Sequence, residues 1–229
     1  MKKILLLFII LLSACSNSNH ASQSNINSQE NQFETVPVKN NINGVTIDDS
    51  SVNTRNIENY LFRNDTVYVD LRPYSEVARE GHIAGFSFYP FYDFIASIEN
   101  SKDYNKNPMD NRLFKMINEM GKIGQIGNFV PNYEESEFVL NELFPKDKNI
   151  FAISIEGSEC IYFLNLLIQY GYDSAKLYNI GGFSIASCLE NIAYISVENP
   201  KYLVPGNPLL NTVGNNETFD FMKDLTPIN

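Results

Sequence analysis

Apolar residues in this chain follow two patterns: short uninterrupted runs, and stripes at helical spacing. Short runs bounded by turn residues are typical of buried strands, and stripes at intervals of three and four residues are typical of helices. The runs predict strands over residues 67–70, 86–89, 150–155 and 175–178. The stripes predict helices over residues 55–62, 75–79, 93–99, 111–120, 134–143 and 158–170. Strands separated by helices indicate an α/β fold, with a parallel sheet flanked by helices on both faces.

The first fifteen residues have the pattern of a processed leader. Two lysines precede an unbroken apolar run over residues 4–12, and Leu-Ser-Ala-Cys follows at residues 12–15. The run is too short for a membrane span, which needs about 20 apolar residues. Its last four residues resemble the bacterial lipobox, in which the cysteine is diacylated and begins the mature chain. We therefore expect a signal peptide over residues 1–14 and a lipid on Cys15; the alternative is an ordinary signal peptide with an unrelated cysteine.

The chain changes in composition after this leader. Residues 15–43 are rich in Ser, Asn and Gln and contain almost no aromatic side chains. Such a segment buries too little apolar surface to offset its ordering entropy, so it is predicted to be a disordered tether. Residues 44–229 are long enough for one domain with a sizeable core. We expect this domain to be lipid-anchored in the bacterial cell envelope, on the extracytoplasmic side of a membrane.

The acidic composition limits the classes of partner. The formal net charge is −10 and becomes −12 once Lys2 and Lys3 leave with the leader. Negative charge repels nucleic acid and anionic lipid headgroups. We therefore expect no nucleic-acid partner, and membrane attachment has to come from the acyl chains on Cys15.

Cysteine and histidine residues are few. Cys160 and Cys188 remain once Cys15 is assigned to the lipid, and an even pair outside the cytoplasm permits a disulfide. Their spacing fits neither a zinc site nor a redox CxxC motif, and the histidines are His20 and His82. The sequence therefore predicts no metal site and no cofactor.

The stretch over residues 151–172 carries the candidate chemistry, because it reads as an apolar strand, a tight polar loop and a helix. The loop is Ser154-Ile155-Glu156-Gly157-Ser158-Glu159-Cys160. A junction of this kind aims backbone N–H groups and the positive end of a helix dipole at one point, and enzymes use it to hold an anion or activate a nucleophile. Here two carboxylates occupy the place where an anion would bind.

Two motifs together resemble the signature of rhodanese-like domains. The first is V-D-L-R-P-Y-S-E at residues 69–76 with G-H-I-A-G-F at residues 81–86, and it contains Asp70, Arg72, Gly81 and His82. The second is the loop at residues 154–160 with G-Y at residues 171–172 and Y-N-I-G-G-F at residues 178–183. The resemblance covers about residues 57–183. It implies a rhodanese-like parallel sheet in which Asp70 and Arg72 support neighbouring loops and the two glycines of the last motif form a turn near the active loop.

The chain departs from the family pattern at two positions that bear on activity. A rhodanese begins the loop with a cysteine that carries sulfur as a persulfide, and an arginine commonly stands five residues later. This chain has Ser154 and Glu159 there. A serine hydroxyl cannot form a persulfide, and Glu156 and Glu159 repel a sulfur-oxyanion donor. We therefore expect a domain without thiosulfate sulfurtransferase activity, whose loop at residues 154–159 binds a protein or small-molecule ligand.

Two catalytic alternatives stay open. Cys160 lies in the first helical turn, where the helix dipole lowers a thiol pKa, so it could be the displaced nucleophile of a sulfurtransferase. Against this, the adjacent Glu159 raises that pKa, and burial of Cys160 or a disulfide with Cys188 is favoured. The second alternative is a hydrolase with Ser154 as nucleophile and His82 as base, although a hydrogen-bonded turn residue is the favoured interpretation of His82.

Two segments extend the compact domain. An insertion at about residues 97–132 ends in a glycine-rich stretch and could cover the loop as a lid or present a binding surface. The extension at about residues 191–229 contains several prolines and is predicted to wrap the surface of the same domain.

Overall fold

Four parallel strands form the central sheet, in the spatial order β3–β1–β7–β8. They are β1 (Thr66–Asp70), β3 (Ser87–Phe88), β7 (Asn149–Ser154) and β8 (Leu177–Gly182). The computed structural model describes residues 35–38, 41–43, 49–97, 112–117, 128–183, 202–209 and 224–228, all within the compact unit Glu34–Asn229. The predicted signal peptide, Cys15, His20 and Cys188 lie outside the described residues.

The helices differ in length and in how they end. They are η1 (Ile57–Tyr60), α1 (Tyr74–Glu80), α2 (Phe91–Phe94), α3 (Ser136–Leu143), α4 (Ser158–Gln169) and η4 (Ser174–Lys176), where η denotes a 3-10 helix. α4 ends where Gly171 takes φ 82°, and the Tyr172 N–H donates to the Leu167 carbonyl at 3.1 Å. This is a Schellman motif, for which glycine is the preferred residue. Among the described helices, none has the length and apolarity needed to cross a membrane.

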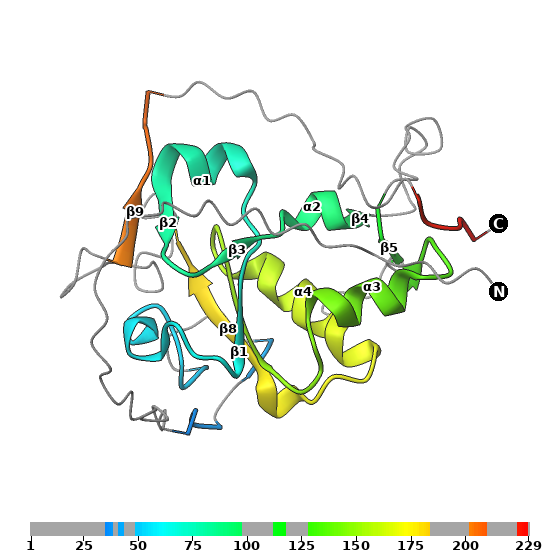
Figure 1. The fold of residues 1–229 in the computed structure, drawn as a ribbon, viewed down its shortest axis with the longest axis horizontal. Coiled ribbons are helices and arrows are strands. Elements are labelled where there is room, and N and C mark those ends of the chain that lie inside the picture. Colours follow the sequence, from blue (N-terminus) through cyan, green and yellow to red (C-terminus); the bar gives the residue numbers. More distant parts are fainter. Residues whose placement is uncertain are drawn as a thin grey trace, which may run out of the picture. The chain divides into compact units, whose positions relative to one another are not determined.

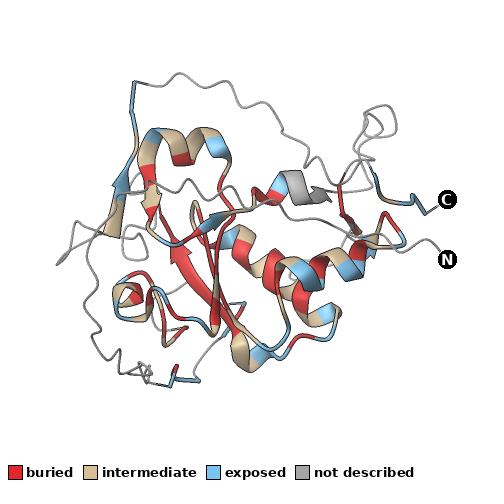
Figure 2. Cartoon of the chain, viewed as in Figure 1, coloured by how far each residue is buried: buried red, intermediate tan, exposed pale blue. Residues whose placement is uncertain are grey.

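Side chains of the sheet alternate between two hydrophobic clusters because a strand has a two-residue period. Ile150 and Ala152 of β7 lie in the cluster that also contains buried side chains of α3 and α4 (Figure 1). Phe151 and Ile153 lie in the cluster completed by η1 and the residues before it. Strands β1, β7 and β8 are therefore buried on both faces, whereas β3 at the edge of the sheet is not, and α4 is buried along one side (Figure 2).

The predicted α/β architecture with a parallel sheet is confirmed, and β1, β7, α1, α3 and α4 lie close to their predicted positions. In place of the helix predicted over residues 55–62, the structure has only the short 3-10 helix η1. At its start, the Ile57 N–H donates a hydrogen bond to the Asn53 carbonyl at 2.9 Å. In the described part of the chain, the second face of the sheet is therefore covered by one short turn and irregular segments rather than by long helices.

Two smaller sheets accompany the central one. β2 (Gly81–Ile83) pairs antiparallel with β9 (Leu203–Pro205), and β4 (Ile95–Ser97), β5 (Phe114–Ile117) and β6 (Asn128–Pro131) form a three-stranded sheet. Near the C-terminus, the Thr226 N–H donates to Glu135 Oε2 at 2.8 Å, and Pro227 bridges to Tyr133. The described parts of the C-terminal extension therefore lie against the domain.

Of the helix predicted over residues 93–99, only residues 93–94 are helical, as the end of α2, and the helix predicted over residues 111–120 was wrong in its described part. β4 occupies part of the first range and β5 part of the second. In β5, Phe114 and Met116 are buried while Lys115 between them is exposed, which is the two-residue period of a strand. The apolar residues of this stretch also fit a helical stripe, and its pairing partners β4 and β6 decide the outcome. The glycine-rich stretch at residues 121–127 lies outside the described residues.

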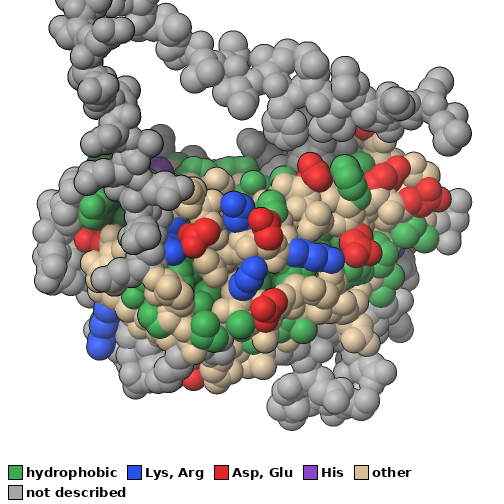
Figure 3. Space-filling model, turned by 60° about the horizontal axis from the view of Figure 1, so that its bottom comes forward, with side chains coloured by type: hydrophobic (Ala, Val, Ile, Leu, Met, Phe, Trp, Pro, Cys, Tyr) green, Lys and Arg blue, Asp and Glu red, His purple; other side chains and the backbone are tan. Residues whose placement is uncertain are grey.

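One face of the molecule, shown in Figure 3, carries Lys and Arg side chains interspersed with Asp and Glu side chains. Hydrophobic side chains are scattered among them rather than gathered in one broad patch. Mixed charge without a large apolar patch is typical of a solvent-facing protein surface.

Gln169 joins the three-stranded sheet to α4. Its amide accepts a hydrogen bond from the Phe129 N–H at 2.8 Å and donates to the Phe129 carbonyl at 2.5 Å. The Tyr170 hydroxyl donates to the same carbonyl at 3.3 Å. The side-chain amide thus pairs with β6 as a neighbouring strand would, so the sheet of the insertion is held to the helix that follows the candidate loop.

We predict that Gln169→Ala lowers the free energy of unfolding by about 1–3 kcal/mol, because the N–H of the buried Phe129 loses its partner and the Phe129 carbonyl keeps only the Tyr170 hydroxyl. Urea denaturation measures the change. Asn141→Ala, on the exposed side of α3, is the control and should stay within about 0.5 kcal/mol of the wild type. Equal stabilities of the two variants would contradict the assigned role of Gln169.

Candidate functional site

The loop between β7 and α4 lies at the carboxyl ends of three parallel strands. Ser154 ends β7 and pairs with Gly182 of β8, and Asp70 ends β1 opposite Ile153. The loop then enters α4 at Ser158. In open α/β sheets, this edge is where ligands commonly bind. The structure therefore brings the candidate loop and the Asp70 motif to the same edge of the sheet.

Gly157 gives the loop its shape. It adopts φ 84°, a left-handed conformation that glycine reaches without a steric cost, and it directly precedes α4. The Asn179 side chain fixes this turn from β8, because its Nδ2 donates to the Gly157 carbonyl at 3.0 Å and its Oδ1 accepts from the Gly181 N–H at 3.0 Å. No role was predicted for Asn179 from the sequence, where only its position within the second motif could have pointed to one.

The prediction that Gly181 and Gly182 form a turn after the last strand was wrong. Both residues belong to β8, which extends to Gly182. A Cβ added at Gly182 would lie 2.6 Å from the Ile155 carbonyl oxygen and 2.9 Å from the Glu156 Cα atom. The absence of a side chain therefore lets the strand lie directly against the loop, which is a packing requirement rather than a turn.

Ser154, at the family's cysteine position, is fully buried. Its Oγ accepts a hydrogen bond from the Gly157 N–H at 2.8 Å, and its carbonyl accepts one from the Phe183 N–H at 2.9 Å. The hydroxyl thus completes the turn of the loop from the inside. This geometry stabilises the loop and keeps the hydroxyl away from solvent.

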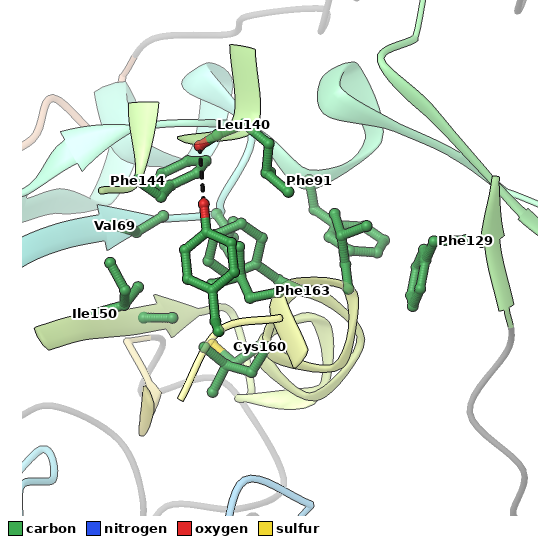
Figure 4. Close-up of a cluster of buried hydrophobic side chains, with 14 of the residues drawn as sticks. Val69, Phe91, Phe129, Leu140, Phe144, Ile150, Cys160 and Phe163 are labelled. Atoms are coloured by element: carbon green, nitrogen blue, oxygen red, sulfur yellow. Dashed lines mark hydrogen bonds between the residues drawn. The ribbon is translucent and has the colours of Figure 1, made fainter. Parts of the chain in front are cut away.

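Cys160 is fully buried and forms no disulfide with another described residue. It belongs to the buried hydrophobic cluster that includes Ile150 and Phe163 (Figure 4). Burial raises the pKa of the Cys160 thiol well above its usual range; the Ser154 hydroxyl opposes this shift, and Glu159 adds to it. A protonated thiol is a poor nucleophile. Cys188 lies outside the described residues, so its disulfide with Cys160 stays a prediction.

His82 lies in β2, where its contacts are structural. Its Nδ1 is 3.1 Å from the Ile83 carbonyl oxygen, and its ring meets Phe88 edge-on with centroids 4.8 Å apart. Within the described residues, no hydrogen bond joins His82 to Ser154. The pair that a serine hydrolase would need is therefore not assembled.

Asp70 and Arg72 form a buried ion pair beside the loop. Arg72 Nη2 lies 2.7 Å from Asp70 Oδ2, and both side chains are almost completely inaccessible to solvent. Arg72 also donates to the Gly81 carbonyl at 2.9 Å, and its guanidinium lies 3.6 Å from the centre of the Phe183 ring. The pair thus ties the end of β1 to β2 and to the residue after β8, as a scaffold would.

Carboxylates gather on the side of this scaffold that faces α1. Arg72 Nη1 lies 3.8 Å from Glu80 Oε2. Burial raises the pKa of the Glu76 carboxyl, and the charges of Glu80 and Glu159 raise it further. Glu76 and Glu80 are four residues apart on one helix, a spacing visible in the sequence.

The accessible part of the loop is polar apart from the half-buried Ile155. Ser158 is exposed, Glu156 and Glu159 are half-buried, and the Ser158 hydroxyl donates to Glu159 Oε2 at 3.1 Å. Across the described residues, no three Cys, His, Asp or Glu side chains are placed to hold a metal ion. The arrangement offers hydrogen-bond acceptors and negative charge at the start of α4.

Comparison with known proteins gives no match for this chain among family models, curated proteins or solved structures.

We predict that iodoacetamide modifies Cys160 at least about tenfold more slowly in the native chain than in urea, because the folded thiol is buried and protonated. Peptide mapping by mass spectrometry measures the modification. The same mapping in urea, with and without reductant, tests the bridge to Cys188, because a disulfide blocks labelling until it is reduced. Rapid labelling of Cys160 in the native chain would contradict its assignment as a packing residue.

Proposed function

We propose that this protein is a lipid-anchored envelope protein whose rhodanese-like domain binds a ligand or protein partner through residues 154–159 and does not transfer sulfur. The burial of both candidate nucleophiles carries this proposal. Ser154 uses its hydroxyl inside the loop, and Cys160 lies in the hydrophobic core with a raised pKa.

The rhodanese-like assignment is supported by the placement of the two sequence motifs. Parallel strands β1 and β7 are neighbours, and the segments that follow them carry the Asp70 motif and the loop. Asp70 and Arg72 have the scaffold contacts that the resemblance implies. These features are those expected if the resemblance reflects a common fold.

The chemistry of sulfur transfer explains why this loop is unsuited to it. In that reaction a cysteine thiolate attacks the outer sulfur of thiosulfate, a persulfide forms, and sulfite leaves with the electron pair of the broken S–S bond. Ser154 supplies no thiolate at the expected position. Glu156 and Glu159 add negative charge where the thiosulfate and the leaving sulfite would need stabilisation.

The same features leave the loop suited to recognition. The start of α4 presents the exposed Ser158 beside two half-buried carboxylates. The turn beneath it is held by Ser154 and Asn179, so little conformational entropy remains to be lost on binding. The lipid proposed for Cys15 would keep this surface at the membrane, at the end of the predicted tether.

We expect the purified and reduced full chain to show no thiosulfate:cyanide turnover above the background of its Cys160→Ala variant, because the thiol is inaccessible. A catalytically active rhodanese serves as the positive control of the assay. Turnover that is lost in Cys160→Ala and retained in Ser154→Ala would overturn the non-catalytic function and favour the displaced cysteine as nucleophile.

Photocrosslinking in cells tests the binding role. A photoreactive amino acid in place of Ser158 should give a discrete crosslinked product, whereas the same amino acid in place of the exposed Glu142 on α3 should not. Identical products from both positions, or none from position 158, would contradict a specific binding surface at the loop.

In the same cells, Cys15→Ser should move the chain from the membrane to the soluble fraction if Cys15 carries the lipid.

A further inference from the structure

The C-terminal extension returns to the domain at residues 202–207, which we call the strap and which lie along β2 and the end of α1 (Figure 1). The Ala84 N–H donates to the Tyr202 carbonyl at 2.8 Å, and β9 then pairs antiparallel with β2. Beyond β9, the Asn207 N–H donates to the Ala78 carbonyl of α1 at 2.8 Å. Backbone hydrogen bonds therefore hold the strap at both of its ends.

Two glycines allow the strap to lie directly against the junction of α1 and β2. A Cβ atom added at Gly81 would overlap the Val204 carbonyl oxygen and would lie 2.7 Å from the Gly206 nitrogen. A Cβ atom added at Gly206 would overlap the Gly81 nitrogen and the Arg79 carbonyl oxygen. Gly81 also has φ 86°, whereas the φ of Gly206 lies outside the left-handed region. Glycine at position 206 is therefore required for space rather than for backbone conformation.

Gly81 connects the strap to the buried ion pair. Its carbonyl accepts a hydrogen bond from Arg72 Nη2 at 2.9 Å. The Asp70 carboxylate accepts from Arg72 Nη2 at 2.7 Å and from Arg72 Nε at 3.0 Å, whereas Nη1 has no hydrogen-bond partner among the described residues. In the described part of the chain, Asp70 and Gly81 are therefore the hydrogen-bond partners that orient this buried guanidinium.

Arg72 extends the connection to the candidate loop. Its guanidinium carbon lies 3.6 Å from the centre of the Phe183 ring. The Phe183 N–H donates to the Ser154 carbonyl at 2.9 Å, and the Ser154 hydroxyl oxygen accepts from the Gly157 N–H at 2.8 Å. A continuous series of contacts thus runs from Gly206 in the strap to the turn of the loop.

We propose that the strap positions the candidate loop: it packs on Gly81 and fixes the carbonyl that orients Arg72, and Arg72 in turn holds Phe183 against the loop. Displacing the strap would move this carbonyl. Because a buried donor without a partner is costly, Arg72 would then shift to recover an acceptor, and its contact with Phe183 would change. The proposal rests on the proposed function only in treating residues 154–159 as the binding surface.

Hydrogen exchange of individual amides in Gly206→Ala tests the proposal, measured by NMR on the full chain in detergent. Exchange at Ala84 should accelerate, because its hydrogen bond to the strap is lost. Exchange at Gly157 and Phe183 should accelerate at least about tenfold more than at Phe144, the buried residue after α3, because the hydrogen bonds of the loop open more often. A uniform loss of stability would accelerate all of these amides alike.

A second variant and a matched control separate the strap's position from its composition. Tyr202→Ala leaves both glycines in place and removes the ring contact with Phe62, whose centroid lies 6.0 Å from that of Tyr202. It should accelerate exchange at the same amides to a smaller extent, and it serves as the test if Gly206→Ala does not fold. Val204→Thr, at an exposed position of β9, should leave all of these rates unchanged.

Two outcomes would overturn the proposal. One is faster exchange at Ala84 without a preferential change at Gly157 and Phe183, because the strap would then be displaced while the loop stays in place. The other is an unchanged rate at Ala84 in Gly206→Ala, because close approach at Gly206 would then not hold the strap. These measurements need no binding partner, so they succeed or fail independently of crosslinking from position 158.

Discussion

The buried ion pair between Asp70 and Arg72 is the interaction on which the arrangement of the candidate site depends. A buried guanidinium is costly unless its charge is matched and its donors are satisfied, and Asp70 meets most of that requirement at 2.7 Å. The same guanidinium contacts the Gly81 carbonyl and the Phe183 ring. One side chain therefore connects the ends of β1 and β8 with β2, and the loop after β7 lies within this frame.

The loop is ordered by internal contacts that use the groups a catalyst would present to its substrate. The Ser154 hydroxyl is bonded to the Gly157 amide, and Cys160 packs into the hydrophobic core. Gly182 and Asn179 hold the loop from β8 by close approach and by hydrogen bonds. Under the proposed function, these contacts provide a rigid acidic surface at the start of α4.

Sequence-based prediction succeeded for elements that local interactions determine and failed for elements that depend on partners distant in the sequence. β1, β7 and α4 were predicted because their apolar patterns are strong, and Gly171 ends α4 by a local rule. The strand β5 was predicted as a helix, because its short apolar run fits both periods and its partners lie elsewhere in the chain. For the site, the sequence located the loop and the Asp70 motif, whereas the hydrogen bonds of Asn179 were found only in the structure.

The sequence alone determined the residue types of the loop, and with them the absence of a thiol at its first position and the presence of two carboxylates. It also determined the alternation that buries both faces of β7, because side-chain direction along a strand is a local property. Tertiary structure decided the environments of these groups. The complete burial of Ser154 and Cys160 depends on elements that are distant in sequence and packed together. Solvation and electrostatic interaction depend on distance in space, so the sequence named these groups and the fold set their chemistry.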